Sequence, residues 1–410
     1  MRIGAMQTAV TARRLWDGNG LIDEPAIVIE DGRIASIASR PSTEVAAELA
    51  GNAAVFRFPG ATLSPAFFDA HIHGAAGHDV MEATPEALAA IGSLLAAHGT
   101  GSFLATTVTA PLDATLRAVS GLARLIREPS LVDERNSNSE PLARPVGIHL
   151  EGPFLSHAKR GVQPAEHLLA PDLAVFDRLF EAAEGQVRLM TLAPELPGAT
   201  ELVAHAVARG VRVSVGHSNA TAAETRAAIA AGATSATHTF NAMRPLDHRE
   251  PGILGVALTD DALFSELICD GIHTAPEMVK LWWRAKGPER AILVTDAISA
   301  AGMPDGEHQL GTFAVQVEGG KAMANGVLAG SVLTLDKALK NFIAFTRAPL
   351  EQALRLLTAN PAAMTGLGRR AGTLAVGQPA NLVAVDEEGK LMASLVGGRP
   401  VAAGARDESR

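Results

Sequence analysis

The sequence contains a single cysteine, Cys269, so a disulfide within the chain is excluded. One unpaired thiol suits a reducing compartment better than an oxidising one. No apolar run approaches the roughly 18–20 residues that a membrane-spanning helix needs, and the first residues lack the apolar core of a secretory signal. These absences predict a cytoplasmic protein with no membrane partner.

The chain also lacks an excess of positive charge: 35 Lys and Arg oppose 44 Asp and Glu, for a formal net charge of -9. Nucleic acid is therefore not an expected partner, although local basic pockets remain compatible with this balance. At 410 residues the chain exceeds the roughly 250–300 residues that one hydrophobic core supports. One large domain and a smaller one are expected.

Both ends of the chain read as β structure. Near the N-terminus, residues 26–30 and 33–37 are apolar runs on either side of Asp31-Gly32, which predicts a hairpin with a tight turn. Residues 372–386 show the same alternation of apolar runs and turn residues. We therefore expect a small β-sandwich domain built from residues 1–61 and 365–410, with residues 62–364 inserted between its halves.

The inserted part alternates short apolar runs with Ala-rich amphipathic segments, several of which end at glycine. The runs are Thr62–His73, Gly101–Val108, Val146–Glu151, Val187–Pro194, Val211–His217, Ala236–Asn241, Phe264–His273 and Ala291–Asp296. The expected helices are Pro85–His98, Leu112–Arg127, Glu201–Arg209, Ala222–Ala231 and Pro276–Lys286, while residues 128–145 read as a polar surface connection. Eight such strands favour an α/β fold, a closed (β/α)8 barrel of the TIM type.

Histidines and carboxylates stand where these strands end. In a parallel barrel those ends meet at one mouth, so Glu151, His217 and His238 are expected to converge. A carboxylate ending an apolar strand needs a cationic partner, and a Glu/His/His set suits zinc or iron with one position open for water. His71 and His73 share one strand face. They fit a second ligand pair, or simply polar residues at a strand end.

Two further strand ends carry residues suited to proton transfer. Asp296 could take a proton from an attacking water, or it could cap a following helix. His273 could donate to a carbonyl oxygen as negative charge develops there. The loop that contains Arg249 also carries Arg244, and it fits either phosphate binding or an exposed charged loop.

Together these segments resemble the N-acetylglucosamine-6-phosphate deacetylases of the amidohydrolase superfamily over almost the whole chain and in the family's order. The matching segments are residues 149–154 (HLEGPF), 216–221 (GHSNAT), 237–243 (THTFNAM), 249–252 (REPG), 270–273 (DGIH), 294–297 (VTDA), 328–331 (LAGS) and 333–336 (LTLD).

The resemblance implies metal-dependent hydrolysis of the N-acetyl group of an amino-sugar 6-phosphate. It implies a divalent metal, zinc or iron, on Glu151, His217 and His238, and Asp296 as the acid/base. A second metal on His71 and His73 is retained in some members, so one or two per subunit are expected. The implied substrate contacts are His273, Asn241, Ala242, the lid turn Leu328-Ala329-Gly330, and Arg249, which reaches the neighbouring site of a homodimer or of a dimer of dimers.

The chain departs from the family after Lys159-Arg160-Gly161. The family usually has a small residue and then His among its substrate contacts here, whereas this sequence has Val162 and Gln163. Gln donates a hydrogen bond but carries no charge. A galactosamine-6-phosphate deacetylase therefore stays open, as does an amidohydrolase acting on another N-acyl or cyclic amide. A non-catalytic assembly protein fits less well, because the expected ligands and Asp296 are all present.

Overall fold

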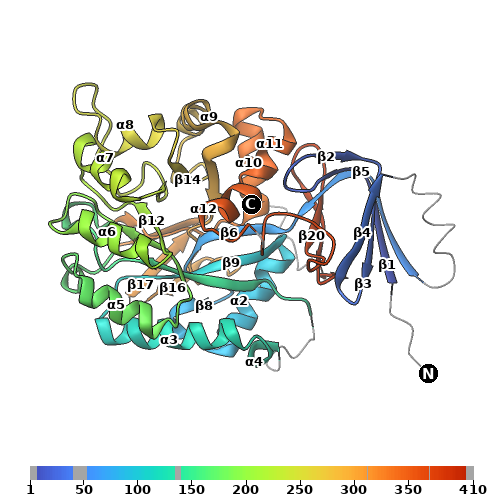
Figure 1. The fold of residues 1–410 in the computed structure, drawn as a ribbon, viewed down its shortest axis with the longest axis horizontal. Coiled ribbons are helices and arrows are strands. Elements are labelled where there is room, and N and C mark those ends of the chain that lie inside the picture. The colour runs from blue at the N-terminus through green and yellow to red at the C-terminus, as the bar shows by residue number, and fades with distance from the viewer. Residues whose placement is uncertain (1–6, 40–52, 134–139, 312, 369, 403–410) are drawn as a thin grey trace.

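The computed structural model describes residues 7–39, 53–133, 140–311, 313–368 and 370–402. The remaining residues of the two predicted terminal segments, and 134–139 of the predicted surface connection, lie outside this part. Figure 1 shows a barrel ringed by helices, with a β-rich part made from both chain ends beside it. No helix in the described part is long and apolar enough to cross a membrane.

The barrel is an eight-stranded parallel sheet in which each strand pairs with its neighbours in chain order. A parallel bridge between Ile72 and Ala297 joins the first strand to the segment after the last one, which closes the barrel. Its strands are β6 (Phe67–Ile72), β9 (Thr100–Thr107), β10 (Arg144–Glu151), β11 (Val187–Leu192), β12 (Arg212–Val215), β13 (Ser235–Ala236), β14 (Phe264–Ile268) and β15 (Ala291–Val294). The barrel is confirmed and each predicted run overlaps one of its strands, but residues 62–65 of the first run belong to the sheet formed by the chain ends.

The later strands are shorter than the sequence predicts. His217, His238 and Asp296 were placed at strand ends, but each has a positive φ, of 47°, 28° and 50° respectively. This backbone conformation is incompatible with an extended strand. The ladder therefore stops a residue or more earlier, and the three side chains project from the turns that follow.

Helices cover the outside of the barrel because each buries an apolar face against the strands. In α7, Thr221 and Glu224 form a capping box at the start, and Gly232 (φ 115°) ends the helix. The sequence analysis did not predict α4, α5, α8, α10, α11 or α12, and α4 lies in the expected surface connection. The barrel helices are α2 (Pro85–Ala97), α3 (Leu112–Arg127), α4 (Ser130–Asp133), α5 (Leu173–Ala182), α6 (Ala199–Ala208), α7 (Ala222–Ala231), α8 (Gly252–Thr259), α9 (Pro276–Arg290), α10 (Leu335–Thr346), α11 (Leu350–Arg355) and α12 (Ala359–Met364).

The chain ends form a second eight-stranded sheet, in which β5 pairs with β1 from the N-terminal side and with β20 from the C-terminal side. Side chains from both ends, such as Val10, Ile27 and Leu382, share one apolar core. The predicted β domain built from both termini is thus present. Its strands are β1 (Gln7–Trp16), β2 (Leu21–Asp23), β3 (Pro25–Glu30), β4 (Arg33–Ser39), β5 (Ala53–Pro65), β20 (Leu382–Val385), β21 (Leu391–Val396) and β22 (Arg399–Pro400).

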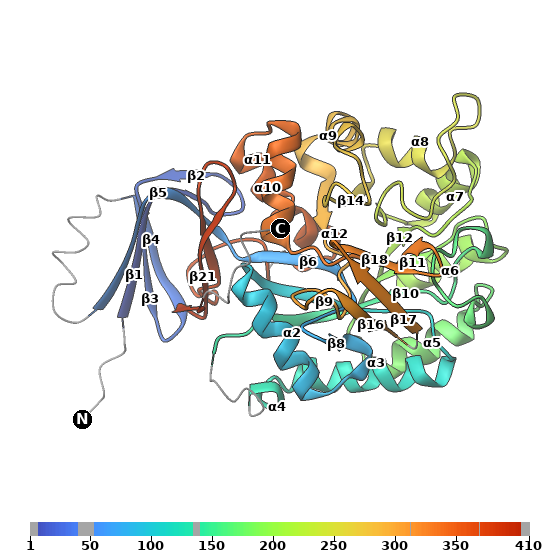
Figure 2. The same ribbon diagram turned by 180° about the vertical axis from the view of Figure 1, so that it is seen from behind.

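A smaller antiparallel sheet, not predicted from the sequence, is inserted between β15 and α10. Figure 2 shows its strands crossing in front of the barrel. The Asp79 carboxylate accepts the backbone N–H of Gly311 at 2.7 Å, which fastens this sheet to the segment after β6. The remaining short elements are β7 (Gly74–Ala75), β8 (His78–Asp79), η1 (Val80–Glu82), η2 (His157–Lys159), η3 (Ala165–His167), β16 (Gly306–Leu310), β17 (Phe313–Glu318), β18 (Lys321–Ala324) and β19 (Val327–Leu328).

Candidate active site

Two groups of buried side chains meet at the carboxyl ends of the barrel strands, and in each group the ligand atoms lie within 4.8 Å of one another. We name them the Glu151 group, which is Glu151, His217 and His238, and the Asp296 group, which is His71, His73 and Asp296. All six come from residues that the sequence analysis selected.

In the Glu151 group the donor atoms point at a common centre. Oε1 of Glu151 lies 3.2 Å from Nε2 of His217 and 3.2 Å from Nε2 of His238. The two Nε2 atoms are 3.1 Å apart. Two ring nitrogens and a carboxylate oxygen at this spacing form a typical set of ligands for a divalent metal.

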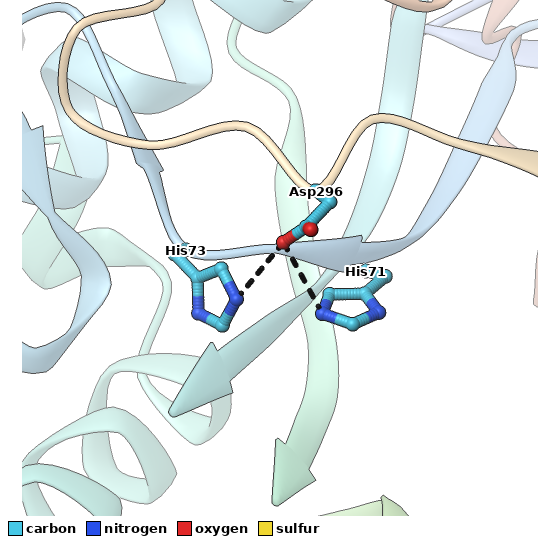
Figure 3. Close-up of side chains that lie close together, drawn as sticks. All are labelled: His71, His73 and Asp296. Atoms are coloured by element: carbon cyan, nitrogen blue, oxygen red, sulfur yellow. Dashed lines mark ion pairs between the residues drawn. The ribbon is translucent and has the colours of Figure 1, made fainter. Parts of the chain in front are cut away.

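In the Asp296 group one carboxylate oxygen faces both rings (Figure 3). Oδ1 of Asp296 lies 3.1 Å from Nε2 of His73 and 3.5 Å from Nε2 of His71. Glu151 lies between the two groups, since its Oε1 is 3.4 Å from His71 Nε2 and its Oε2 is 3.3 Å from His73 Nε2. Glu151 can therefore serve both groups.

The carboxylates and histidines of the site shift each other's pKa values. Burial would raise the pKa of the Asp296 carboxyl, but the charge of His71 and the hydrogen bond from His73 hold it at about 2. Burial would lower the pKa of His73, but hydrogen bonds to Asp296 and Glu151 raise it to about 10. Burial likewise opposes protonation of His71, yet Glu151 and Asp296 raise its pKa well above the ordinary value. Without metal, protonated His71 and His73 therefore offset the negative charges of Glu151 and Asp296.

The histidines are oriented as metal ligands. Nδ1 of His73 lies 3.0 Å from the Thr106 carbonyl oxygen, and Nδ1 of His217 lies 3.0 Å from that of Lys159. A ring that donates from Nδ1 presents the lone pair of Nε2. Nε2 of His71 is buried and makes no hydrogen bond, although it faces the carboxylates. These residues fit a divalent metal, and nitrogen and oxygen donors of this kind suit zinc or iron.

The positive φ angles noted above fall on three of these six residues. A left-handed conformation costs a residue other than glycine of order 1–3 kcal/mol and persists only where its surroundings enforce it. Here the turns after β12, β13 and β15 place His217, His238 and Asp296 in the two groups at the mouth.

Asp296 does not cap a helix, so that interpretation of the sequence is wrong. Its backbone N–H donates to the His71 carbonyl at 2.8 Å, and its carbonyl accepts the Ser331 N–H at 2.8 Å. In the described part, the next helix is α10, which has Thr334 at its N-cap. The side chain of Asp296 is directed instead to the histidines.

The predicted lid turn lies against Asp296. Leu328 ends β19, Ala329 is buried and Gly330 has φ 59°. A Cβ built on Gly330 would lie 2.5 Å from Cγ2 of Ile298 and 2.9 Å from the Asp296 carbonyl oxygen. Glycine is therefore required at this close approach.

His273 lies in the turn after β14 and pairs with a carboxylate. Its Nδ1 is 2.6 Å from Oδ2 of Asp270. Burial would lower the pKa of His273, but this hydrogen bond and the charges of Asp270 and Asp296 raise it. The ring is thereby oriented with Nε2 available as a donor.

Gln163 is buried, and both ends of its amide are engaged. Its Oε1 accepts the Thr109 N–H at 2.8 Å, and its Nε2 donates to Oε2 of Glu151 at 2.8 Å. Because a backbone N–H can only donate, the amide orientation is fixed. Val162 packs at the edge of the inserted sheet's apolar core. The contact with the sugar stays a prediction for both residues; the hydrogen bond that Gln163 makes here is to a candidate metal ligand.

The expected sugar-phosphate contacts follow β13. Asn241 donates its N–H to the His238 carbonyl at 3.0 Å, and the Ala242 carbonyl accepts the Ser218 N–H at 3.0 Å. Arg249 is exposed on the loop before α8, which projects past the barrel helices in Figure 1. Within the described residues its guanidinium forms no ion pair. These roles stay predictions.

Sequence reasoning missed two fully buried carboxylates below the site, Asp69 and Glu266. Asp69 accepts the Thr295 hydroxyl at 2.6 Å, and burial raises its pKa to about 7. Glu266 approaches His71. The available signal was an acidic residue inside an otherwise apolar strand. His149 lies in the interior, as predicted, with its Nε2 2.8 Å from the Thr191 hydroxyl.

Comparison with known proteins supports the site. The family model described as "Amidohydrolase family" matches residues 62–402. The N-acetylgalactosamine-6-phosphate deacetylase of Escherichia coli O157:H7 is 38% identical over 93% of this chain and 96% of its own length. The N-acetylglucosamine-6-phosphate deacetylase of Lysinibacillus sphaericus is 38% identical over 93% of this chain and 95% of its own.

A solved structure is similar over nearly the whole fold. A variant of the N-acetyl-D-glucosamine-6-phosphate deacetylase from Mycobacterium smegmatis, in complex with N-acetyl-D-glucosamine-6-phosphate, is 37% identical. The match covers 97% of this chain and 99% of that one, with a TM-score of 0.86.

Proposed function

Because the chain belongs to the amidohydrolase family, we propose that it hydrolyses the N-acetyl group of N-acetylglucosamine 6-phosphate to glucosamine 6-phosphate and acetate. The observation that carries this proposal is the convergence of the Glu151 and Asp296 groups at one barrel mouth. The likeness to deacetylases of amino-sugar phosphates over 93% of the chain supports the substrate class.

The Glu151 group would hold one divalent metal, zinc or iron, and His71 and His73 with Asp296 would hold a second. A metal at such a site supplies an activated water at neutral pH and polarises the amide carbonyl. The donors suit this role, since they are imidazole nitrogens and carboxylate oxygens, and the rings of His73 and His217 are oriented by second hydrogen bonds.

Asp296 is the proposed acid/base. Its pKa of about 2 keeps it ionised at neutral pH, so it can accept a proton from the attacking water. The same carboxyl then carries that proton to the amide nitrogen as the C–N bond breaks. Amines leave poorly without a proton, so this delivery is the step that most needs a positioned group.

His273 is proposed to stabilise the oxygen of the reacting acetyl group. With Nδ1 held by Asp270, its Nε2 faces away from that carboxylate. A donor fixed in advance stabilises developing negative charge better than mobile water does. We assign Asn241, Ala242, Val162, Gln163 and the turn Leu328-Ala329-Gly330 to sugar binding, because all of them lie on segments that border the two groups.

Phosphate recognition is proposed to involve a homodimer. Arg249 is exposed and has no acidic partner among the described residues, so its guanidinium is free to bind phosphate through two parallel hydrogen bonds. The loop projects from the barrel, which suits a contact with the neighbouring subunit's site.

The galacto epimer is the second candidate, because the relatives acting on each epimer are 38% identical to this chain. The test is acetate release from both N-acetylhexosamine 6-phosphates and from their unphosphorylated forms. The proposal expects the gluco 6-phosphate to have the highest kcat/KM. Higher kcat/KM for the galacto 6-phosphate would reassign the substrate, and no acetate from any metal-loaded sample would overturn the proposal.

A further inference from the structure

Glu266 is a buried carboxylate that the proposed reaction does not use. It lies on β14 and is 0% exposed. Its Oε2 lies 3.4 Å from Nδ1 of His71 and accepts the backbone N–H of His238 at 3.3 Å. Its Oε1 is buried and makes no hydrogen bond in the described structure. A buried carboxylate with so few partners is costly, so a structural role alone accounts poorly for it.

The histidines of the site differ in what supports the ring nitrogen that faces away from the mouth. Nδ1 of His73 and Nδ1 of His217 each face a neutral backbone carbonyl. Nδ1 of His238 is buried and makes no hydrogen bond. Among these four described rings, only that of His71 is backed by a carboxylate.

The position of Glu266 decides which nitrogen of His71 is available. Nε2 of His71 points at Glu151 and Asp296. To present a lone pair there, the neutral ring must carry its proton on Nδ1, and an anionic acceptor at Nδ1 favours that tautomer. The same acceptor makes Nε2 a stronger metal donor than a carbonyl acceptor would.

We propose that Glu266 is a positioning residue of the metal centre. It fixes His71 with Nε2 directed into the Asp296 group, and through the His238 N–H it links this ring to the turn that carries His238 of the Glu151 group. The inference rests on the proposed function, since it requires that these residues bind metal. Glu266 faces the ring of His71 but only the backbone N–H of His238, so its loss should affect the Asp296 group more than the Glu151 group.

The test is Glu266→Gln, which keeps the size and one acceptor oxygen but removes the charge. The matched control is Asp336→Asn, since Asp336 also faces a ring nitrogen, Nδ1 of His98 at 3.1 Å, but lies outside the two ligand groups. Metal-free protein of each variant is titrated with Co²⁺ and followed by visible absorption and by competition with a chelator. Near-ultraviolet circular dichroism reports on folding.

Wild type is expected to bind two equivalents. Glu266→Gln should retain the tighter one and weaken the other by about 10–100-fold, the effect typical of losing an outer partner of a metal-bound histidine. Asp336→Asn should bind both as wild type does. A purely structural role for Glu266 predicts instead equal weakening of both equivalents together with a lower Tm, and that result would overturn the inference.

Two more outcomes separate this inference from the proposed function. Wild-type protein that binds no Co²⁺ contradicts the proposed function itself. If wild-type protein binds Co²⁺ and every bound equivalent keeps its wild-type affinity in Glu266→Gln, the role of Glu266 alone is overturned. If Glu266→Gln does not fold, Glu266→Asp is tested instead, because its shorter side chain moves the carboxylate away from Nδ1 of His71. Glu266→Asp should then weaken the same Co²⁺ equivalent, and wild-type affinity in that variant would overturn the proposed role of Glu266.

Discussion

The two ligand groups at the barrel mouth each combine one carboxylate with two histidines, but they depend on different parts of the fold. The Glu151 group comes from the ends of β10, β12 and β13, on one side of the barrel. The Asp296 group comes from β6 and from the turn after β15, which are the first and last strands of the barrel sheet. It therefore exists only when the barrel closes, at the Ile72–Ala297 bridge.

They also differ in chemical duty. The residues of the Glu151 group are proposed to bind metal only. In the Asp296 group one carboxylate is both a candidate ligand and the proposed acid/base. The residues of the Asp296 group come from both sides of the junction that closes the barrel, and Asp296 must also exchange protons. We therefore expect additional contacts to hold these side chains in place. On that side Glu266 lies beside His71, and the Gly330 turn packs against Asp296.

The largest effect is expected at Glu151, the residue that both groups share. Glu151→Ala should release metal from both groups and reduce acetate formation to background, because the buried histidines lose their anionic partner. Elemental analysis and acetate release measure this. Glu201→Ala, an exposed substitution on α6, is the control. Full metal content in Glu151→Ala would contradict its position between the groups.

A smaller but still large effect is expected at Asp296, and it separates ligand from acid/base. Asp296→Asn should lower kcat by about 10²–10⁴-fold, the range for losing a general acid/base, with a much smaller change in KM. Metal in the Glu151 group should remain, as elemental analysis would show. A kcat within about threefold of wild type would remove Asp296 from proton transfer.

Arg249 tests whether the site extends beyond one subunit. Arg249→Ala should raise KM for the 6-phosphorylated sugar by about 10–100-fold, from the roughly 1.5–3 kcal/mol of a hydrogen bond to a charged group. KM for the unphosphorylated sugar should hardly change. Arg117→Ala, on the exposed face of α3, is the control.

Mixing Arg249→Ala with Asp296→Asn protein tests the same arrangement directly. After subunit exchange, hybrid dimers should regain part of the activity, since one site then has both intact residues. No recovery despite demonstrated exchange would place Arg249 in its own subunit's site or outside the site altogether.

The smallest effect is expected in the pH dependence of metal affinity, because metal and protons compete for the same histidine nitrogens. Carboxylates raise the pKa of His73 to about 10 in the metal-free site, against the effect of burial. A histidine with a raised pKa binds a proton below that value, so metal must displace this proton at neutral pH. Metal affinity of the Asp296 group should therefore rise by up to about tenfold per pH unit for each displaced proton. The rise should level off for His73 near pH 10.

Calorimetry in buffers of different ionisation enthalpy would measure the protons released. His73→Asn removes the titrating ring and should reduce that number. An affinity independent of pH between 7 and about 9 would contradict the expected competition between metal and protons.

The sequence was sufficient for the order of the strands and for most of the residues that meet at the barrel mouth. Apolar runs set the barrel strands, and polar residues at their ends selected Glu151, His217, His238 and Asp296 before any geometry was known. This succeeds because a parallel barrel brings equivalent strand ends to one mouth, so order along the chain predicts proximity.

Local reasoning failed where long-range contacts decide. The inserted sheet of β16 to β19 packs its apolar side chains with Val108, Ile298 and Ala300, and its own strands carry no signal of these partners. The sequence analysis considered Gln163 only as a contact of the sugar, whereas in the structure its amide donates a hydrogen bond to Glu151. Glu266 was read only as part of an apolar strand, because its partner His71 lies 195 residues away along the chain.

The sequence by itself therefore determined the fold class, the strand order and which residues stand at the barrel mouth. Only the tertiary structure decided that these residues form two groups sharing Glu151, that left-handed turns carry three of them, and that Glu266 lies beside His71. Periodicity is a local property of the chain, and it fixes which way a side chain faces. Distances between donor atoms depend on barrel closure and on buried partners far apart in sequence, which no local pattern contains.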